Sequence, residues 1–306
     1  MILQSANTRS CKKSLQLSLP VEMMICFAQL VNPNYDAHKR PGLGEGVPVS
    51  NPDAANQIVN DLVQDGYFID FVEELIRINA NGYMGRQYTI WGLNDVITGL
   101  SNEGYSFDKV SGQFFEDQIK RISTNWGRLQ EGDERKMSVL RMDIVGNSIL
   151  VKNNPRPKIE KAYRDIRNIV SRSVNNRLGR LWSWEGDGAL AAFLFGPSDK
   201  MAVFAGMEIL HELFFYNRLH NPLSSPINVR LGVTIGKVKY SKSETERLKN
   251  ETVKQAVFLE SLADNNSLCV SYNLYITMDQ YSLSQFGPEK SSGGWKFRIY
   301  TPGMEK

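Results

Sequence analysis

The stretch Met137-Ser-Val-Leu-Arg-Met-Asp143-Ile-Val-Gly146-Asn-Ser148 puts an aspartate at the end of an apolar, β-prone run, just before a glycine-marked turn. A second aspartate, Asp187, lies in Trp184-Glu-Gly-Asp-Gly188, between two further β-prone runs. Carboxylates at the ends of neighbouring strands are the oxygen ligands that Mg²⁺ or Mn²⁺ prefers, and these ions bind nucleotide phosphates. The pair therefore points to phosphoryl chemistry.

Segments of strand and helix character alternate around the two aspartates. Apolar residues recur at helical spacing in some segments and form β-branched runs in others. The expected strands and helices are 138–145, 158–170, 181–185, 189–195, 198–216, 228–238, 253–262, 267–271 and 295–300. The order β-α-β-β-α-β is typical of a ferredoxin-like layer with helices packed on one sheet. We therefore predict an α+β fold for residues 137–306.

A mainly helical domain with a hairpin is predicted for residues 19–117. Ser50 or Asn51 can cap a helix that ends at Gly66, and aromatic residues around Gly112 predict a β-hairpin. The further helices are expected at 20–32, 68–76 and 93–100. Helices followed by a hairpin suggest a winged-helix-like module, which binds either DNA or another protein.

Charge favours the protein-interaction interpretation of this module. Arg86 and Lys109 are the only basic residues between Asn79 and Gln118, so the segment has no basic stripe. We expect residues 1–18 to be disordered. Residues 118–136 are expected to be a linker, either a solvated connector or a segment that couples the two domains.

The composition is that of an ordinary globular protein of 306 residues. The 36 basic and 33 acidic side chains nearly balance, so net charge gives no argument for nucleic acid or an anionic membrane. The three cysteines, Cys11, Cys26 and Cys269, are widely spaced, which argues against a disulfide framework or a zinc site. No apolar run reaches the roughly 20 residues of a membrane helix. We expect a cytoplasmic protein with no membrane partner.

Four stretches in this order resemble the catalytic domain of class III nucleotidyl cyclases, the family of adenylate and guanylate cyclases. The stretches are 137–146, 184–193, 229–238 and 258–271, and the resemblance covers about residues 136–300. Each motif alone is weak, because Gly-Asp-Gly is also an ordinary hairpin turn. Their common order and spacing make the resemblance fairly specific for the fold.

The resemblance implies an enzyme that converts a nucleoside triphosphate to a 3′,5′-cyclic nucleotide and pyrophosphate. Asp143 and Asp187, with Ile144 beside them, would hold two Mg²⁺ or Mn²⁺ ions. The residues implied in phosphate binding are Gly146, Asn147, Ser148, Lys237 and Lys296. Because family members build the site between two such domains, the resemblance also implies a homodimer.

The sequence departs from the family at four positions. Ser183 and Arg247 stand where the family reads the base, and Lys254 and Phe258 stand where it has a transition-state asparagine and arginine. Lys254 keeps a positive charge and would partly substitute in catalysis. Arg247 only donates hydrogen bonds, which suits guanine O6 and N7 better than the adenine amino group. ATP is therefore not the expected substrate.

Three functions remain open at this point. The first is a nucleotidyl cyclase, which we favour because both metal-binding aspartates are kept. The second is a catalytically degenerate cyclase-like domain that binds nucleotide, or only dimerises, within a regulatory protein. The third is a transcription or scaffold protein in which the N-terminal module acts.

Overall fold

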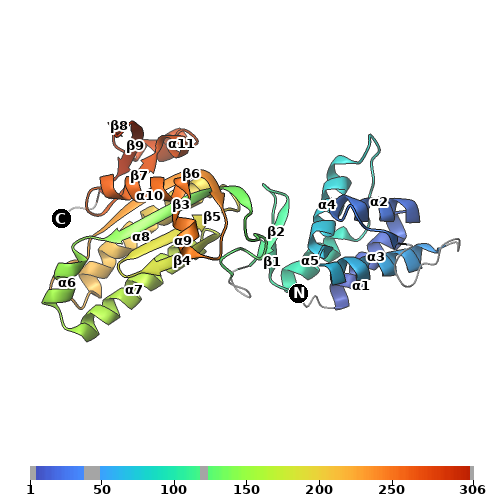
Figure 1. Ribbon diagram of the computed structural model, residues 1–306, viewed down its shortest axis with the longest axis horizontal. Helices are drawn as coiled ribbons and strands as arrows, with labels where there is room; N and C mark the ends of the chain where they lie inside the picture. The colour runs from blue at the N-terminus through green and yellow to red at the C-terminus, as the bar shows by residue number, and fades with distance from the viewer. Residues whose placement is uncertain (1–4, 38–48, 118–122, 304–306) are drawn as a thin grey trace. The chain divides into compact units, whose positions relative to one another are not determined.

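The computed structural model describes residues 5–37, 49–117 and 123–303. The chain divides into two compact units, residues 1–122 and 123–306, which Figure 1 draws as a mainly helical part and a larger part around a sheet. In the described part of the chain, no helix is both long and apolar enough to span a bilayer.

The N-terminal unit consists of helices followed by a small hairpin. The elements are α1 (Ser5–Ser18), α2 (Val21–Val31), α3 (Asn51–Asp65), α4 (Phe68–Asn81), α5 (Leu93–Asn102), β1 (Tyr105–Asp108) and β2 (Gln113–Glu116). Helix α3 begins as expected, since the Ser50 hydroxyl accepts a hydrogen bond from the Asp53 amide at 3.3 Å. It ends at Gly66, which has a left-handed φ of 84°.

Helix α1 corrects the expectation that residues 1–18 are disordered. From Ser5 onward these residues form a helix, while residues 1–4 lie outside the described part. Cys11, Leu15 and Leu19 recur every four residues and are almost fully buried in the core of the unit. The apolar stripe is narrow and is interrupted by polar and basic residues, so the sequence pattern did not indicate a helix.

Thiol labelling should distinguish the three cysteines. Cys11 and Cys269 are buried, and burial raises the pKa of each thiol to about 12, whereas Cys26 is partly exposed. We expect a disulfide reagent at pH 8 to modify Cys26 alone in the native protein and all three cysteines in denaturant. Cys26→Ser is the control, and rapid labelling of that native variant would contradict the placement of α1 and of the strand that holds Cys269.

The C-terminal unit is built around a seven-stranded sheet with the order β4-β5-β3-β6-β7-β9-β8. The strands are β3 (Glu134–Ile144), β4 (Gly179–Glu185), β5 (Gly188–Phe193), β6 (Val229–Lys239), β7 (Ser267–Ser271), β8 (Lys290–Ser292) and β9 (Trp295–Tyr300). The four strands β4-β5-β3-β6 are antiparallel and have the ferredoxin-like order that the alternation of elements predicted. Only β6 and β7 pair in parallel among the described strands.

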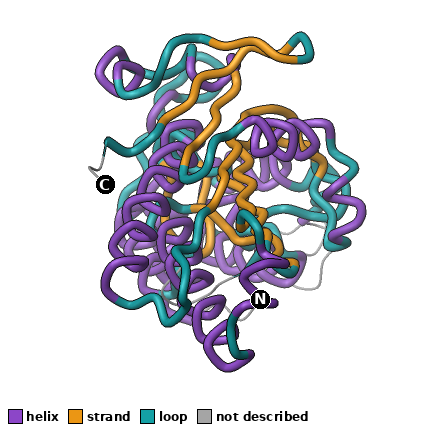
Figure 2. Tube along the Cα trace, turned by 90° about the vertical axis from the view of Figure 1, so that its left-hand side faces the viewer, coloured by secondary structure: helices purple, strands orange, loops and turns teal. Residues whose placement is uncertain are grey.

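Helices cover both faces of this sheet (Figures 1 and 2). The helices are α6 (Asn147–Asn153), α7 (Arg156–Asn175), α8 (Ser198–Leu219), α9 (Glu244–Leu248), α10 (Glu251–Leu262), α11 (Tyr272–Tyr275) and α12 (Gln280–Ser284). Leu140, Met142 and Ile144 of β3 share one core with α7 and α8. Because side chains alternate along a strand, Arg141 and Asp143 lie on the opposite face, which α10 partly covers.

Two glycines of β6 explain how closely α10 approaches the sheet. A Cβ atom on Gly232 would lie 2.3 Å from the Ala256 carbonyl oxygen, and one on Gly236 would lie 2.5 Å from the Thr252 hydroxyl. The glycines of β6 therefore allow α10 to pack closely against this strand. This contact fixes the helix over the face that carries Asp143.

Replacing Gly232 by alanine should destabilise the C-terminal unit. The new methyl group meets backbone atoms of α10 that cannot rotate away, so we expect a loss of about 3 kcal/mol in the free energy of unfolding. Urea denaturation measures it. Gly303→Ala is the control, since a Cβ there meets nothing within 4 Å. Equal stability of the two variants would show that α10 does not lie on β6.

Residues 123–132 belong to the C-terminal unit and not to a free linker. Trp126 is fully buried, and its indole Nε1 donates to the Leu178 carbonyl at 2.8 Å. Arg180 donates to the Ser123 carbonyl at 2.9 Å. The predicted linker 118–136 is thereby corrected: 118–122 lie outside the described residues, the next ten residues pack on this unit, and β3 begins at Glu134.

Candidate functional site

The sheet register brings the two aspartates together. Asp143, near the end of β3, lies opposite Gly188 of β5, the residue that follows Asp187 in the hairpin turn. The turn is held against β3 because the Ile144 amide donates to the Asp187 carbonyl at 3.2 Å. Gly186 allows the turn with a left-handed φ of 55°. Two carboxylates from separate motifs thus meet at one edge of the site.

The electrostatics at Asp143 suit a bound cation. Its pKa is raised, first by burial and then by the negative charge of Asp187, while Arg230 and Arg141 lower it only in part. A divalent ion would relieve this repulsion, and carboxylate oxygens are ligands of the hardness that Mg²⁺ and Mn²⁺ take. Among the described residues, no group of three or more histidine, cysteine or acidic side chains is placed so that it could hold a metal ion.

Arg230 is a site residue that the sequence reasoning missed. It lies opposite Asp143 in the β3–β6 register, and its Nη2 is 3.4 Å from Asp143 Oδ2. Its Nε lies 2.9 Å from Oε1 of Glu260, a carboxylate of α10 with only 8% of its side chain exposed. Arg230 therefore links Asp143 to a buried acid. Nothing in the sequence gave this register.

The turn after Asp143 leads from β3 directly into α6. Gly146 has a φ of 67° and open space around it, and α6 starts at the next residue, Asn147. The Tyr163 hydroxyl of α7 donates to Asn147 Oδ1. Burial, followed by the negative charge of Asp187, raises the pKa of Tyr163. Gly146, Asn147 and Ser148 thus follow directly on the carboxylate pair.

Three lysines expected at the site are engaged elsewhere in the chain. Lys237 is corrected: it lies seven residues along β6 from Arg230, is 82% exposed and pairs with Glu134 at 3.1 Å. Lys254 of α10 pairs with Glu251 at 2.7 Å, and Lys296 of β9 pairs with Glu289 at 2.9 Å. None of them pairs with Asp143 or Asp187 in one copy of the chain.

The two expected base-reading residues have different surroundings. Arg247 of α9 is 5% exposed, and its guanidinium donates to the backbone carbonyls of Ser241, Lys242 and Trp182 at 2.8–3.1 Å. Its donors thus bind the protein itself, which corrects its assignment to a base and removes the argument against ATP. Ser183 of β4 is half-buried beside a register irregularity and stays a candidate.

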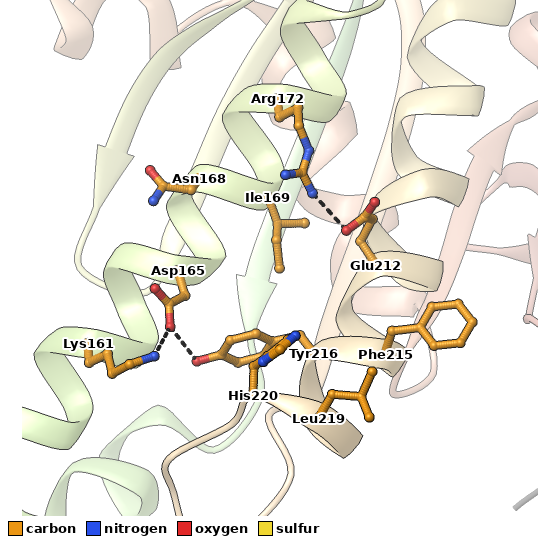
Figure 3. Close-up of a pocket in the computed structure, with 10 residues that line it drawn as sticks. All are labelled: Lys161, Asp165, Asn168, Ile169, Arg172, Glu212, Phe215, Tyr216, Leu219 and His220. Atoms are coloured by element: carbon orange, nitrogen blue, oxygen red, sulfur yellow. Dashed lines mark hydrogen bonds and ion pairs between the residues drawn. The ribbon is translucent and has the colours of Figure 1, made fainter.

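A groove between α7 and α8 has a volume of about 490 Å³ (Figure 3). Asp165 there accepts from Lys161 at 2.6 Å and from the Tyr216 hydroxyl at 3.2 Å, and Arg172 pairs with Glu212 at 2.7 Å. These charges neutralise one another. The groove also lies on the face of the sheet opposite Asp143, so we do not assign it to the phosphoryl site.

Cyclase domains are among the solved structures that resemble part of this chain. The guanylyl cyclase domain of the RhoGC fusion protein from Blastocladiella emersonii is 14% identical with a TM-score of 0.48, over 56% of this chain and 97% of that chain. An adenylate/guanylate cyclase/hydrolase from Silicibacter pomeroyi is 20% identical with a TM-score of 0.46, over 56% of this chain and 99% of that chain. The adenylyl cyclase CyaB from P. aeruginosa is 16% identical with a TM-score of 0.45, over 56% and 96%.

No protein-family model matches the sequence, and no curated protein matches it at a significant level. With identities of 14–20% and TM-scores of 0.45–0.48, these likenesses carry no argument for the activity. We therefore base the functional proposal on the residues of the site.

Proposed function

We propose that the C-terminal unit is a nucleotidyl cyclase that forms a 3′,5′-cyclic nucleotide and pyrophosphate from a nucleoside triphosphate. The observation that carries the proposal is the meeting of Asp143 and Asp187 at the hairpin turn, with Arg230 at 3.4 Å from Asp143. Two carboxylates for metal ions and a guanidinium beside them form a site for a polyphosphate.

In the proposed reaction the 3′-hydroxyl oxygen attacks the α-phosphorus of its own nucleotide. The bond from that phosphorus to the bridging oxygen breaks, pyrophosphate leaves with the electron pair, and the hydroxyl proton passes to solvent. Two divalent ions held by Asp143 and Asp187 would lower the pKa of the 3′-hydroxyl and neutralise charge on the phosphates. Arg230 would bind phosphate oxygens, and the turn at Gly146 would orient the outer phosphates.

The site is proposed to be completed by a second copy of the chain. Lys254 and Lys296 do not pair with the aspartates within one copy, and several large apolar side chains on or next to α10, α11, α12 and β9 are exposed. These are Val257, Tyr272, Ile276, Tyr281 and Trp295, with 39–80% of each residue exposed. A homodimer through this face would cover them and bring the lysines of one copy to the carboxylates of the other.

Mixing two inactive variants tests the shared site. If Asp143→Ala and Lys254→Ala lie in different halves of one site, a mixed dimer keeps one intact site out of two. Random mixing then restores about a quarter of wild-type turnover. Each variant mixed with wild type is the control, and a mixture that stays as inactive as its components would contradict the shared site.

A second function, nucleotide binding without turnover, is favoured by one observation. Phe258 of α10 is half-buried, and its ring lies 3.4 Å from the position of a Cβ on Gly293. The ring is thus packed against the β8–β9 turn and brings no charge to a phosphate. In this case the unit would bind a metal ion and a nucleoside triphosphate without turnover. The bound state of this site would then regulate a partner protein or domain.

A turnover screen separates the two functions. The protein is incubated with each of the four nucleoside triphosphates and Mn²⁺, and pyrophosphate release is measured beside triphosphate binding by calorimetry. The cyclase proposal expects binding and release with at least one triphosphate. Binding without release would favour the second function, and absence of both would contradict the site.

A further inference from the structure

Arg141 is a second guanidinium near Asp143, in addition to Arg230. It precedes Asp143 by two residues on β3, so both side chains project from the same face of the sheet. Its positive charge lowers the pKa of Asp143 and that of Glu260, so it lies near both carboxylates. Arg141 is therefore beside the metal-binding carboxylate, although it forms no ion pair with it.

The hairpin is shaped to admit this guanidinium. A Cβ on Gly188 would lie 2.3 Å from Nη2 of Arg141 and 2.8 Å from its Cζ. The guanidinium thus lies directly against the backbone of the residue after Asp187. The second glycine of Gly-Asp-Gly is required because any side chain there would displace Arg141.

Arg141 has unused hydrogen-bonding capacity. Its Nε is buried without a partner, and no hydrogen bond of its guanidinium is found with the side chains that the structure describes. A buried donor without a partner costs free energy, and a ligand that accepts its hydrogen bond would offset that cost. Arg230 differs, since Asp143 and Glu260 already engage it on two sides.

We propose that Arg141 binds the phosphates of the substrate and stabilises the charge that develops during transfer, acting from the same copy of the chain that supplies Asp143 and Asp187. This inference rests on the proposed function. A guanidinium suits the task because its planar fork binds two phosphate oxygens at once. The phosphate half of the site then carries two arginines, Arg230 held by carboxylates and Arg141 available to the substrate.

The test compares Arg141→Met and Arg141→Lys with wild type. Arg135→Met is the matched control, since Arg135 is exposed on the same strand and face. We expect Arg141→Met to lower kcat by about 100-fold or more. We expect it to weaken the binding of inorganic pyrophosphate about tenfold. For Arg141→Lys we expect a kcat and a pyrophosphate affinity between those of Arg141→Met and wild type. For Arg135→Met we expect both values to equal those of wild type.

Binding of Mn²⁺ alone separates a phosphate contact from a positioning role. Removing a positive charge near the carboxylates leaves Mn²⁺ affinity unchanged or increases it, if Arg141 serves the phosphates. Weaker Mn²⁺ binding in Arg141→Met would instead show that the guanidinium only orients Asp143, and would overturn the proposal. A pyrophosphate affinity of Arg141→Met within twofold of the wild-type affinity would also overturn the proposal.

The pyrophosphate titration keeps this inference separate from the proposed function. If wild type turns over no triphosphate, the cyclase proposal fails, yet a tenfold difference in pyrophosphate affinity would still support Arg141. Should Arg141→Met not fold, Gly188→Ala takes its place, because its methyl group displaces the guanidinium. We expect the same loss of pyrophosphate binding, and unchanged binding would overturn the proposal.

Discussion

Asp143→Asn and Asp187→Asn should each reduce cyclic nucleotide formation below detection, while Asp143→Asn raises the melting temperature of the metal-free protein at pH 7. The loss follows because an amide is a poor ligand for a hard divalent cation. The gain follows because burial and the charge of Asp187 hold the pKa of Asp143 above its usual value. The folded protein therefore disfavours the ionised carboxylate and accepts the neutral amide.

The stability gain expected for Asp143→Asn depends on pH. A carboxyl group whose pKa is raised by folding contributes most stability at low pH, and that contribution is lost as pH rises through the raised pKa. The difference in melting temperature between Asp143→Asn and wild type should therefore shrink as pH falls toward 4. Mn²⁺ should stabilise wild type and not the variant.

Asp264→Asn is the control for these measurements, because Asp264 is an exposed carboxylate. It should keep turnover and the stabilisation by Mn²⁺. A metal-free Asp143→Asn protein that is less stable than wild type at pH 7 would show that the Asp143 carboxylate stabilises the fold. It would contradict the expectation that this carboxylate destabilises the fold until a metal ion binds.

Arg230→Met should have the second largest effect, because it removes a phosphate ligand and also leaves Glu260 unpaired. Breaking a buried ion pair on one side costs about 3 kcal/mol in the free energy of unfolding. The double variant Arg230→Met/Glu260→Gln should recover most of that stability and none of the activity. Chemical denaturation and turnover of the three proteins measure the two effects separately.

Acid should reduce the stability loss of Arg230→Met. Burial already raises the pKa of Glu260, and removal of its partner raises it further. Protonated Glu260 needs no cation, so the gap to wild type narrows as pH falls toward the pKa of Glu260. If the double variant is no more stable than Arg230→Met at pH 7, the stability loss does not come from an unpaired Glu260 carboxylate.

The parts of the site that follow a turn could be predicted from sequence. Asp143 and Asp187 each combine a β-prone run with glycine, and that local pattern survives in the structure. The alternation of strands and helices likewise predicted the ferredoxin-like order of β4-β5-β3-β6. Local patterns suffice for both, because turn residues and periodicity act within a few positions.

The residues that depend on strand register or long-range contacts could not be predicted. Arg230 lies beside Asp143 only because β3 and β6 pair in one register, while Lys237 seven positions on is far from it. Arg247 is held by carbonyl groups of Trp182 and Ser241, and the distance along the chain to Trp182 is 65 residues. Arg141 was within reach of the sequence, because two-residue alternation alone puts it on the face of Asp143.

The central claim is tested most directly by identifying the products. Wild-type protein is incubated with the triphosphate that releases most pyrophosphate and with Mn²⁺, and the products are quantified by mass spectrometry, with Asp143→Asn as the blank. The account expects a 3′,5′-cyclic nucleotide and pyrophosphate in equal amounts from wild type alone. A linear monophosphate, a diphosphate, or no product beyond the blank would contradict it.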